Sequence, residues 1–197
     1  MRLILASSSP YRQDMLKRLA LPFTAIPPDV DERPLPGENP AALALRLARA
    51  KAAAVAQRHP GGIIIGSDQV ATFDGRAIGK PGDHESATAQ LHMLSGRSVT
   101  FHTALCVTDG RHEESDDIVT VCRFRQLGAD EIQHYLLRER PYDTAGSAKA
   151  EGLGIALMDA MQSDDPTAII GLPLIALSRM LRGFGLNPLL AHTESTT

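Results

Sequence analysis

Near its N-terminus the chain reads Leu3-Ile4-Leu5-Ala6-Ser7-Ser8-Ser9-Pro10-Tyr11-Arg12. The apolar residues predict a buried strand, and the serines, the proline and the arginine follow where a helix would begin. Backbone N–H groups and the dipole at a helix start favour an anion, and an arginine adds a forked, charge-assisted contact. The stretch therefore indicates an α/β fold with a phosphate-binding junction. Ser9 before Pro10 also fits an ordinary helix cap, so the stretch alone leaves both interpretations open.

Outward from this junction, strands and helices alternate through the first hundred residues, and hairpins follow. The expected strands lie at 2–6, 23–26, 63–66, 70–73, 77–78, 99–108 and 118–124, and the expected helices at 11–19, 40–57, 84–94, 130–137 and 173–184. Asn39 and Asp83 are the expected caps of two helices, and Asp74-Gly75 predicts a hairpin turn. We expect one domain over residues 1–190 and a flexible tail at 191–197.

The composition indicates a soluble protein with one sizeable core. The chain has 197 residues, 43% of them hydrophobic, and its formal net charge of -3 argues against binding to long nucleic acid. The sequence contains no signal peptide and no membrane-spanning apolar run, so we expect a cytoplasmic protein without membrane contacts. Cys106 and Cys122 stand in apolar runs that could face each other, but a reducing compartment favours free thiols.

A candidate site follows the apolar run Ile63-Ile64-Ile65-Gly66, which is typical of a central buried strand. Ser67-Asp68-Gln69 comes directly after this run, at its expected carboxyl end. Ligands in open α/β sheets bind outside the carboxyl ends of the strands. The position therefore favours a functional role for Asp68, although an aspartate there could also merely cap a turn.

Basic and acidic side chains elsewhere would complete such a site. Lys51 lies at the edge of the apolar stripe of its expected helix, from which its ammonium can reach a pocket beside the core. Glu32 and Asp68 could hold a hard divalent cation, because such cations prefer carboxylate oxygens. The basic residues that could bind a polyphosphate are Arg12, Lys51, Lys80 and Lys149.

Each of these residues also has a plainer explanation. Lysines are usually solvated, and Asp31-Glu32 stands in a proline-rich loop where carboxylates would be solvated too. Lys149 and Glu151 could form a surface pair, although the nearby glycines suggest backbone that approaches a ligand closely. The seven histidines do not show the spacing of a zinc site.

Several fragments resemble, in order and spacing, the Maf family of nucleoside triphosphate pyrophosphatases over about residues 2 to 190. They are Ala6-Ser7-Ser8-Ser9-Pro10-Tyr11-Arg12, Val30-Asp31-Glu32, Leu47-Ala48-Arg49-Ala50-Lys51-Ala52, Gly66-Ser67-Asp68-Gln69-Val70, Gly79-Lys80-Pro81 and Ala145-Gly146-Ser147-Ala148-Lys149-Ala150-Glu151-Gly152. The resemblance implies a mixed, twisted α/β sheet flanked by helices, an ITPase-like fold with a cleft between two lobes. Family members are commonly dimeric, so a homodimer is expected.

The resemblance also implies an activity, namely hydrolysis between the α- and β-phosphates of a nucleotide to give a monophosphate and diphosphate. The family's proton acceptor falls on Asp68, which would act with Lys51 and Lys80. Expected substrate-binding residues are Ser7, Arg12 and Lys149, and expected metal ligands are Glu32 and Asp68. The cofactor implied is a divalent cation, Mg²⁺ or Mn²⁺.

Substrate choice in the family depends on three positions, which fall on Tyr11, Gln69 and Glu151. Members that act on dTTP and UTP typically carry Arg, Thr and Gln there, so this chain instead resembles the 7-methyl-GTP subgroup, in which Trp is common at the Tyr11 position. An aromatic face attracts the cationic methylguanine, and a carboxylate accepts its N–H donors. A dTTP/UTP pyrophosphatase, and a non-catalytic nucleotide-binding regulator of cell division, remain as alternatives.

Overall fold

The computed structural model describes residues 2–190, which build one mixed sheet with helices on both faces. The strands run in the spatial order β2-β1-β3-β5-β6-β7, with β4 paired to β3 alone. Among the strands of residues 2–190, the β2–β1 and β1–β3 pairs are parallel and the other neighbours are antiparallel. The strands are β1 Arg2–Ala6, β2 Phe23–Ala25, β3 Gly62–Phe73, β4 Arg76–Ile78, β5 Ser98–Thr108, β6 Glu113–Phe124 and β7 Met158–Ser163.

The helices are α1 Pro10–Lys17, α2 Pro40–Ala56, α3 His84–Leu94, α4 Ala129–Glu139 and α5 Leu174–Gly183, with short 3₁₀ segments η1 Ala145–Ser147, η2 Leu153–Leu157 and η3 Ala168–Ile170. Their starts agree with the local sequence signals. The side chains of Ser9, Asn39 and Asp83 each accept a hydrogen bond from a backbone N–H of the first helical turn. Asp74 and Gly75 both have positive φ, as the tight turn between β3 and β4 requires.

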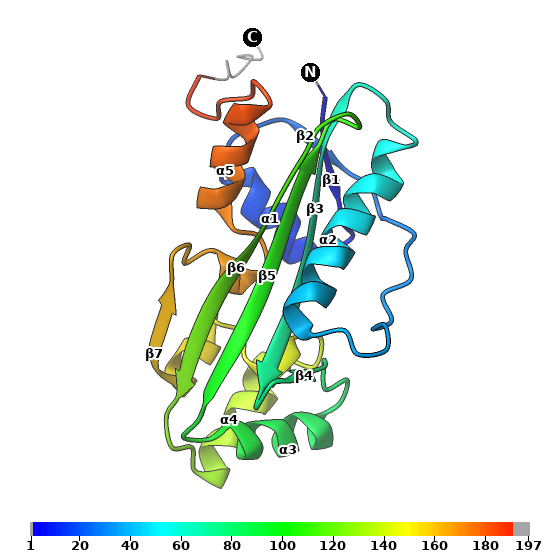
Figure 1. The fold of residues 1–197 in the computed structure, drawn as a ribbon. Coiled ribbons are helices and arrows are strands. Elements are labelled where there is room, and N and C mark those ends of the chain that lie inside the picture. Colours follow the sequence, from blue (N-terminus) through cyan, green and yellow to red (C-terminus); the bar gives the residue numbers. More distant parts are fainter. Residues whose placement is uncertain (1, 191–197) are drawn as a thin grey trace.

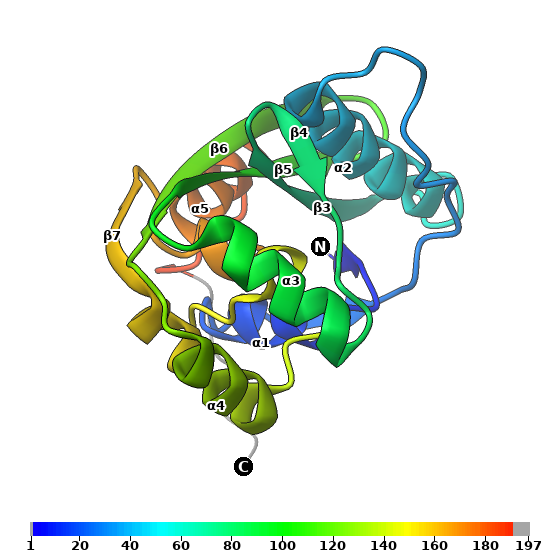
Figure 2. The same ribbon diagram turned by 90° about the horizontal axis from the view of Figure 1, so that it is seen from below.

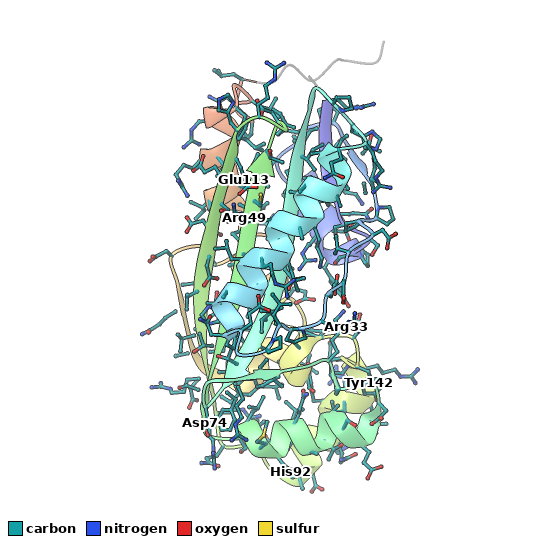
Figure 3. All side chains as sticks on the ribbon, turned by 45° about the vertical axis from the view of Figure 1, so that its right-hand side comes forward. Arg33, Arg49, Asp74, His92, Glu113 and Tyr142 are labelled. Carbon is teal, nitrogen blue, oxygen red and sulfur yellow. The ribbon has the colours of Figure 1, made fainter. Side chains whose placement is uncertain are left out.

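Helix α2 covers one face of the sheet, while α1 and α5 cover the other (Figure 1). Helices α3 and α4 lie together at the lower end, as the view from below shows (Figure 2). Arg49 of α2 pairs with Glu113 at the start of β6, with 2.6 Å between Nε and Oε1 (Figure 3). Among the described residues, no helix is both long and apolar enough to cross a membrane.

A row of buried polar side chains divides the face that carries α1, α5, α3 and α4. Along β5 this face changes from Val99 and Phe101, through Thr103, to Leu105 and Val107. On β3 the half-buried Gln69 lies opposite Thr103 and Ser67 lies opposite Leu105, while on β6 Thr120 lies opposite Phe101, so these polar side chains stand at the border of the two apolar clusters. The polar row separates a cluster under α1 and α5 from one under α3 and α4, which produces the two lobes expected from the sequence.

The structure differs from the sequence interpretation in three points. The runs 63–66 and 70–73 are not separate strands, because β3 continues from Gly62 to Phe73 and Asp68 lies inside it. Strand β7 was not foreseen, since its half-exposed sequence MDAMQS lacks a clear alternation. Cys106 and Cys122 lie opposite Ser115 and Val99 in the β5–β6 register, so the two free thiols do not face each other. The tail predicted at 191–197 lies outside the described residues.

Candidate active site

A cleft of about 620 Å³ opens beyond the end of β1. Strand β1 stops at Ala6 opposite Gly66, while β3 continues past that point to Phe73. Because β1 no longer pairs with β3 beyond Gly66, the middle of β3, with Asp68 and Gln69, lines the cleft. The sequence placed Asp68 after the carboxyl end of its own strand, but the strand that ends at this point is β1 rather than β3.

The phosphate-binding junction predicted from the N-terminal stretch forms one corner of the cleft. The Ser7 hydroxyl accepts a hydrogen bond from the Ser9 N–H at 3.1 Å, which holds the turn before α1. Arg12 donates from Nε to the carbonyl oxygen of Gly171 at 2.9 Å. Burial lowers the pKa of Arg12 from its ordinary value, and Asp68 and Glu32 partly oppose this change. Because Nε is committed to Gly171, the terminal nitrogens are the part of the fork that an anion can use.

Lys51 and Asp68 form a buried ion pair at the centre of the site. Their Nζ and Oδ1 atoms are 2.6 Å apart, and their side chains are 7% and 11% exposed. Glu32, from the loop before α2, brings Oε1 to 2.7 Å from the same ammonium. Burial raises the pKa of Glu32, but contacts with Lys51, Lys80 and Arg12 outweigh it and leave that pKa below its ordinary value. Lys51 is therefore not the solvated lysine that its residue type favours.

The close approach of α2 to β3 is what allows Lys51 to reach Asp68. A β-carbon on Gly66 would overlap the carbonyl oxygen of Ala48 and lie 2.7 Å from the backbone nitrogen of Ala52. The lysine stem therefore crosses only a narrow apolar layer before its ammonium meets the carboxylates. The sequence placed Lys51 at the edge of the apolar stripe, and the structure confirms that its ammonium reaches a site beside the core.

Lys80 lines the cleft from the loop after β4 and is exposed. Gln90 of α3 holds this loop by donating to the Gly79 carbonyl oxygen at 2.9 Å. The same Gln90 accepts a hydrogen bond from the Ser147 hydroxyl at 2.6 Å. One amide side chain therefore links the Lys80 loop to the segment that carries Glu151, a connection that sequence reasoning missed.

The cleft is also lined by Tyr11, Asp143 and Glu151. The Tyr11 hydroxyl donates to Asp143 Oδ2 at 3.2 Å. Lys149 does not pair with Glu151 as one interpretation of the sequence proposed, but lies 3.5 Å from Asp143 Oδ1. Its Nζ also lies 5.7 Å from the centre of the Tyr11 ring. Tyr142, next to Asp143, lies above one end of α3 in Figure 3, and its carbonyl oxygen accepts a hydrogen bond from the Gly82 N–H.

Gln69 is oriented by the protein itself. Its Nε2 lies 3.0 Å from Thr103 Oγ1 and from the Ala168 carbonyl oxygen, and 3.1 Å from that of Ile169. Backbone carbonyl oxygens of η3 therefore accept hydrogen bonds from the polar row between the lobes. The carbonyl oxygen of Gly171, directly after η3, accepts from Arg12 and Ser67. Only Oε1 of Gln69 is left to accept a hydrogen bond from a ligand.

The expected metal ligands Glu32 and Asp68 converge on one point, since both place an oxygen within 2.7 Å of Lys51 Nζ. Among residues 2–190, His, Cys, Asp and Glu do not gather in a group of three or more that could hold a metal ion. A cation bound here would therefore take its other oxygen ligands from water and phosphate, as Mg²⁺ commonly does.

The fold and the cleft together define an α/β protein whose cleft, at the boundary of two lobes, is lined by both basic and acidic side chains. The chain belongs to the Maf family, since the family model described as Maf-like protein matches residues 2–184. It is 69% identical over 191 residues to the 7-methyl-GTP pyrophosphatase of Bordetella pertussis, covering 97% of this chain and 96% of the relative. It is 60% identical over 182 residues to the protein of that name from Ralstonia nicotianae, covering 91% and 94%.

Among solved structures, the Ham1 protein of Staphylococcus aureus has a similar fold. The TM-score is 0.53 at 14% identity, with 93% of this chain and 100% of that chain covered. At this identity the likeness concerns the fold alone, and it confirms the mixed α/β architecture expected from the sequence. The homodimer and the cytoplasmic location stay predictions.

Proposed function

We propose that this protein is a nucleoside triphosphate pyrophosphatase that hydrolyses 7-methyl-GTP to 7-methyl-GMP and diphosphate. Near full-length identity of 60–69% to proteins that carry this name supports the proposal. The single observation that carries it is the buried Lys51–Asp68 pair, which faces the same cleft as Arg12 and the serine-rich start of α1. Charged groups buried in a cleft are typical of catalytic sites, because active sites use burial and neighbouring charges to tune their side chains.

The polyphosphate would lie between the start of α1 and the Lys80 loop. Ser7 and Arg12 line this part of the cleft from the β1–α1 junction, and Lys80 lines it from the loop after β4. Together they can compensate the charge of several phosphate oxygens, which is what a phosphoryl-transfer site must do. Lys149, bound to Asp143 and lying close to Tyr11, would act from the nucleoside end.

Asp68 would act as the proton acceptor. A water attacks the α-phosphorus and passes its proton to the Asp68 carboxylate, while the bond from that phosphorus to the bridging oxygen breaks and diphosphate leaves. Lys51 holds the carboxylate through Oδ1, which leaves Oδ2 to receive the proton. The ion pair therefore orients the base.

A divalent cation, Mg²⁺ or Mn²⁺, fits the donor set of Glu32 and Asp68. The observation behind this is that both carboxylates bind the Lys51 ammonium through one oxygen, so they lie close together and each keeps a second oxygen that could ligate a cation. When bound, such a cation would neutralise phosphate charge. The proline-rich loop that carries Glu32 is held to α2 by the pair of Glu38 with Arg46, 2.6 Å apart.

The base would lie against Tyr11 near Glu151. Methylation at N7 makes guanine cationic, so an aromatic face attracts it, and a carboxylate can accept from its N1–H and N2–H₂ groups. An enzyme for dTTP or UTP is the second candidate from sequence, but the positive charge and two-donor edge that these side chains complement are absent from pyrimidine triphosphates. A non-catalytic regulator would not need the buried Asp68.

The decisive experiment measures diphosphate release from 7-methyl-GTP, GTP, dTTP and UTP in Mg²⁺ and in Mn²⁺. We expect the highest kcat/KM for 7-methyl-GTP. Release from dTTP and UTP in preference to both purines would assign the protein to the pyrimidine enzymes, and no release from any nucleotide would favour the regulator.

Asp68→Asn tests the proton acceptor, because an amide cannot take up the proton. Loss of a general base should lower turnover by roughly 10²–10⁴-fold. Asp14→Asn, which removes a carboxylate paired with Lys17 on the exposed side of α1, is the matched control and should keep wild-type turnover. Turnover of Asp68→Asn above about a tenth of wild type, well short of the expected loss, would remove Asp68 from this role.

A further inference from the structure

Asp143 is an acid at the nucleoside end of the cleft that none of the sequence motifs includes. It lines the cleft together with Tyr11 and Glu151, and its side chain is 58% exposed. Its two carboxylate oxygens have different partners, because Oδ2 accepts from the Tyr11 hydroxyl at 3.2 Å and Oδ1 lies 3.5 Å from Lys149 Nζ. Asp143 therefore connects the expected stacking residue to the nearest lysine.

The first contact orients the Tyr11 ring. Tyr11 is the second residue of α1, and its hydroxyl is bound by a residue 132 positions later in the chain. A ring fixed at its hydroxyl presents a defined face to a ligand and loses less freedom when the ligand stacks on it. Asp143 thus prepares the surface that an aromatic base would use.

The second contact changes the charge that a base meets. Lys149 Nζ lies 5.7 Å from the centre of the Tyr11 ring and would by itself repel a cationic base. Asp143 neutralises that ammonium, so Asp143, Glu151 and Lys149 together leave one net negative charge. Burial raises the pKa of Asp143, but Lys149 and the Tyr11 hydroxyl outweigh it and leave the pKa below its ordinary value, so the carboxylate is charged at neutral pH.

We propose that Asp143 is a further specificity-determining residue, which favours a cationic purine over a neutral one by orienting Tyr11 and neutralising Lys149. This inference rests on the proposed function and deepens it. It predicts that the charge of the base, rather than its shape alone, decides the choice between 7-methyl-GTP and GTP. These two nucleotides differ only in the N7 methyl group and its positive charge, so their ratio of kcat/KM isolates the effect.

The test measures this ratio in wild type, Asp143→Asn and Asp143→Glu. Asparagine keeps an oxygen for the Tyr11 hydroxyl but removes the charge, so the ratio should fall about two- to fivefold, within the range for exposed charge pairs. Glutamate keeps the carboxylate and should retain most of the preference. Tyr11→Phe keeps the ring and the charge but loses the hydrogen bond, so it should reduce the ratio by a smaller factor.

Asp14→Asn removes the same charge from the exposed side of α1 and is the control, for which the ratio should not change. An unchanged ratio in Asp143→Asn, or a wild type that does not prefer 7-methyl-GTP over GTP, would overturn the inference while leaving a pyrophosphatase in place. Absence of diphosphate release from every nucleotide in wild type would instead reject the proposed function, and this inference with it.

Discussion

Replacing Lys51 with methionine should destabilise the protein by leaving Asp68 buried without its partner. Lys51, Asp68 and Glu32 form one charged group, in which Lys51 and Asp68 are almost fully buried whereas the Glu32 side chain is 60% exposed. Removing one partner of a buried ion pair costs about 3–5 kcal/mol, and an exposed pair adds at most about 1 kcal/mol. Arg12 lies close enough to compensate part of the Asp68 charge, so we expect the low end, about 3 kcal/mol.

Urea unfolding at pH 7 measures this loss, and a loss of that size should lower the Tm by about 6–12 °C in a domain of this length. The double variant Lys51→Met/Asp68→Asn removes both charges and should be more stable than the two single losses predict, by about 1–3 kcal/mol. Lys17→Met, which breaks the exposed pair with Asp14, should change stability by less than about 0.5 kcal/mol. A loss below about 1 kcal/mol for Lys51→Met, as for an exposed pair, would refute the reasoning.

Two further predictions concern the parts of the fold that position Lys51, Asp68 and Glu32. Gly66→Ala should push α2 away from β3, because its β-carbon would overlap the Ala48 carbonyl oxygen, and should lower the free energy of unfolding in urea by about 1–3 kcal/mol. Gly79→Ala is the control, since its β-carbon meets open space and should not lower that free energy. Equal stability of the two variants would contradict the close approach of α2 to β3. The hydrogen bond from Arg46 lowers the pKa of Glu38 to about 2 from 4.5, so its contribution to stability is present above about pH 4.5 and is lost as the pH falls towards 2. Glu38→Gln should therefore lower the Tm at pH 6 but not at pH 2, and a Tm difference that persists at pH 2 would argue against the pair.

Local sequence signals determined much of this fold. Serine, asparagine and aspartate caps marked where three helices begin, and Asp74-Gly75 marked the β3–β4 turn. These signals succeed because each depends on backbone groups within three or four residues, so neighbouring residue types suffice to specify them. The family motifs likewise selected residues that do line one cleft, among them Ser7, Arg12 and Asp68.

Only the tertiary structure decided how the site is assembled. The place of Asp68 inside a continuous β3 depends on the pairing of β3 with β5 beyond the end of β1, which no local pattern encodes. The Arg12 bond to Gly171 and the Tyr11 bond to Asp143 join residues 159 and 132 positions apart. Contacts over such separations arise from the packing of whole elements and leave no periodic trace in the sequence. Residue types alone could therefore indicate the chemistry of the cleft, while chain topology determined which atoms meet there.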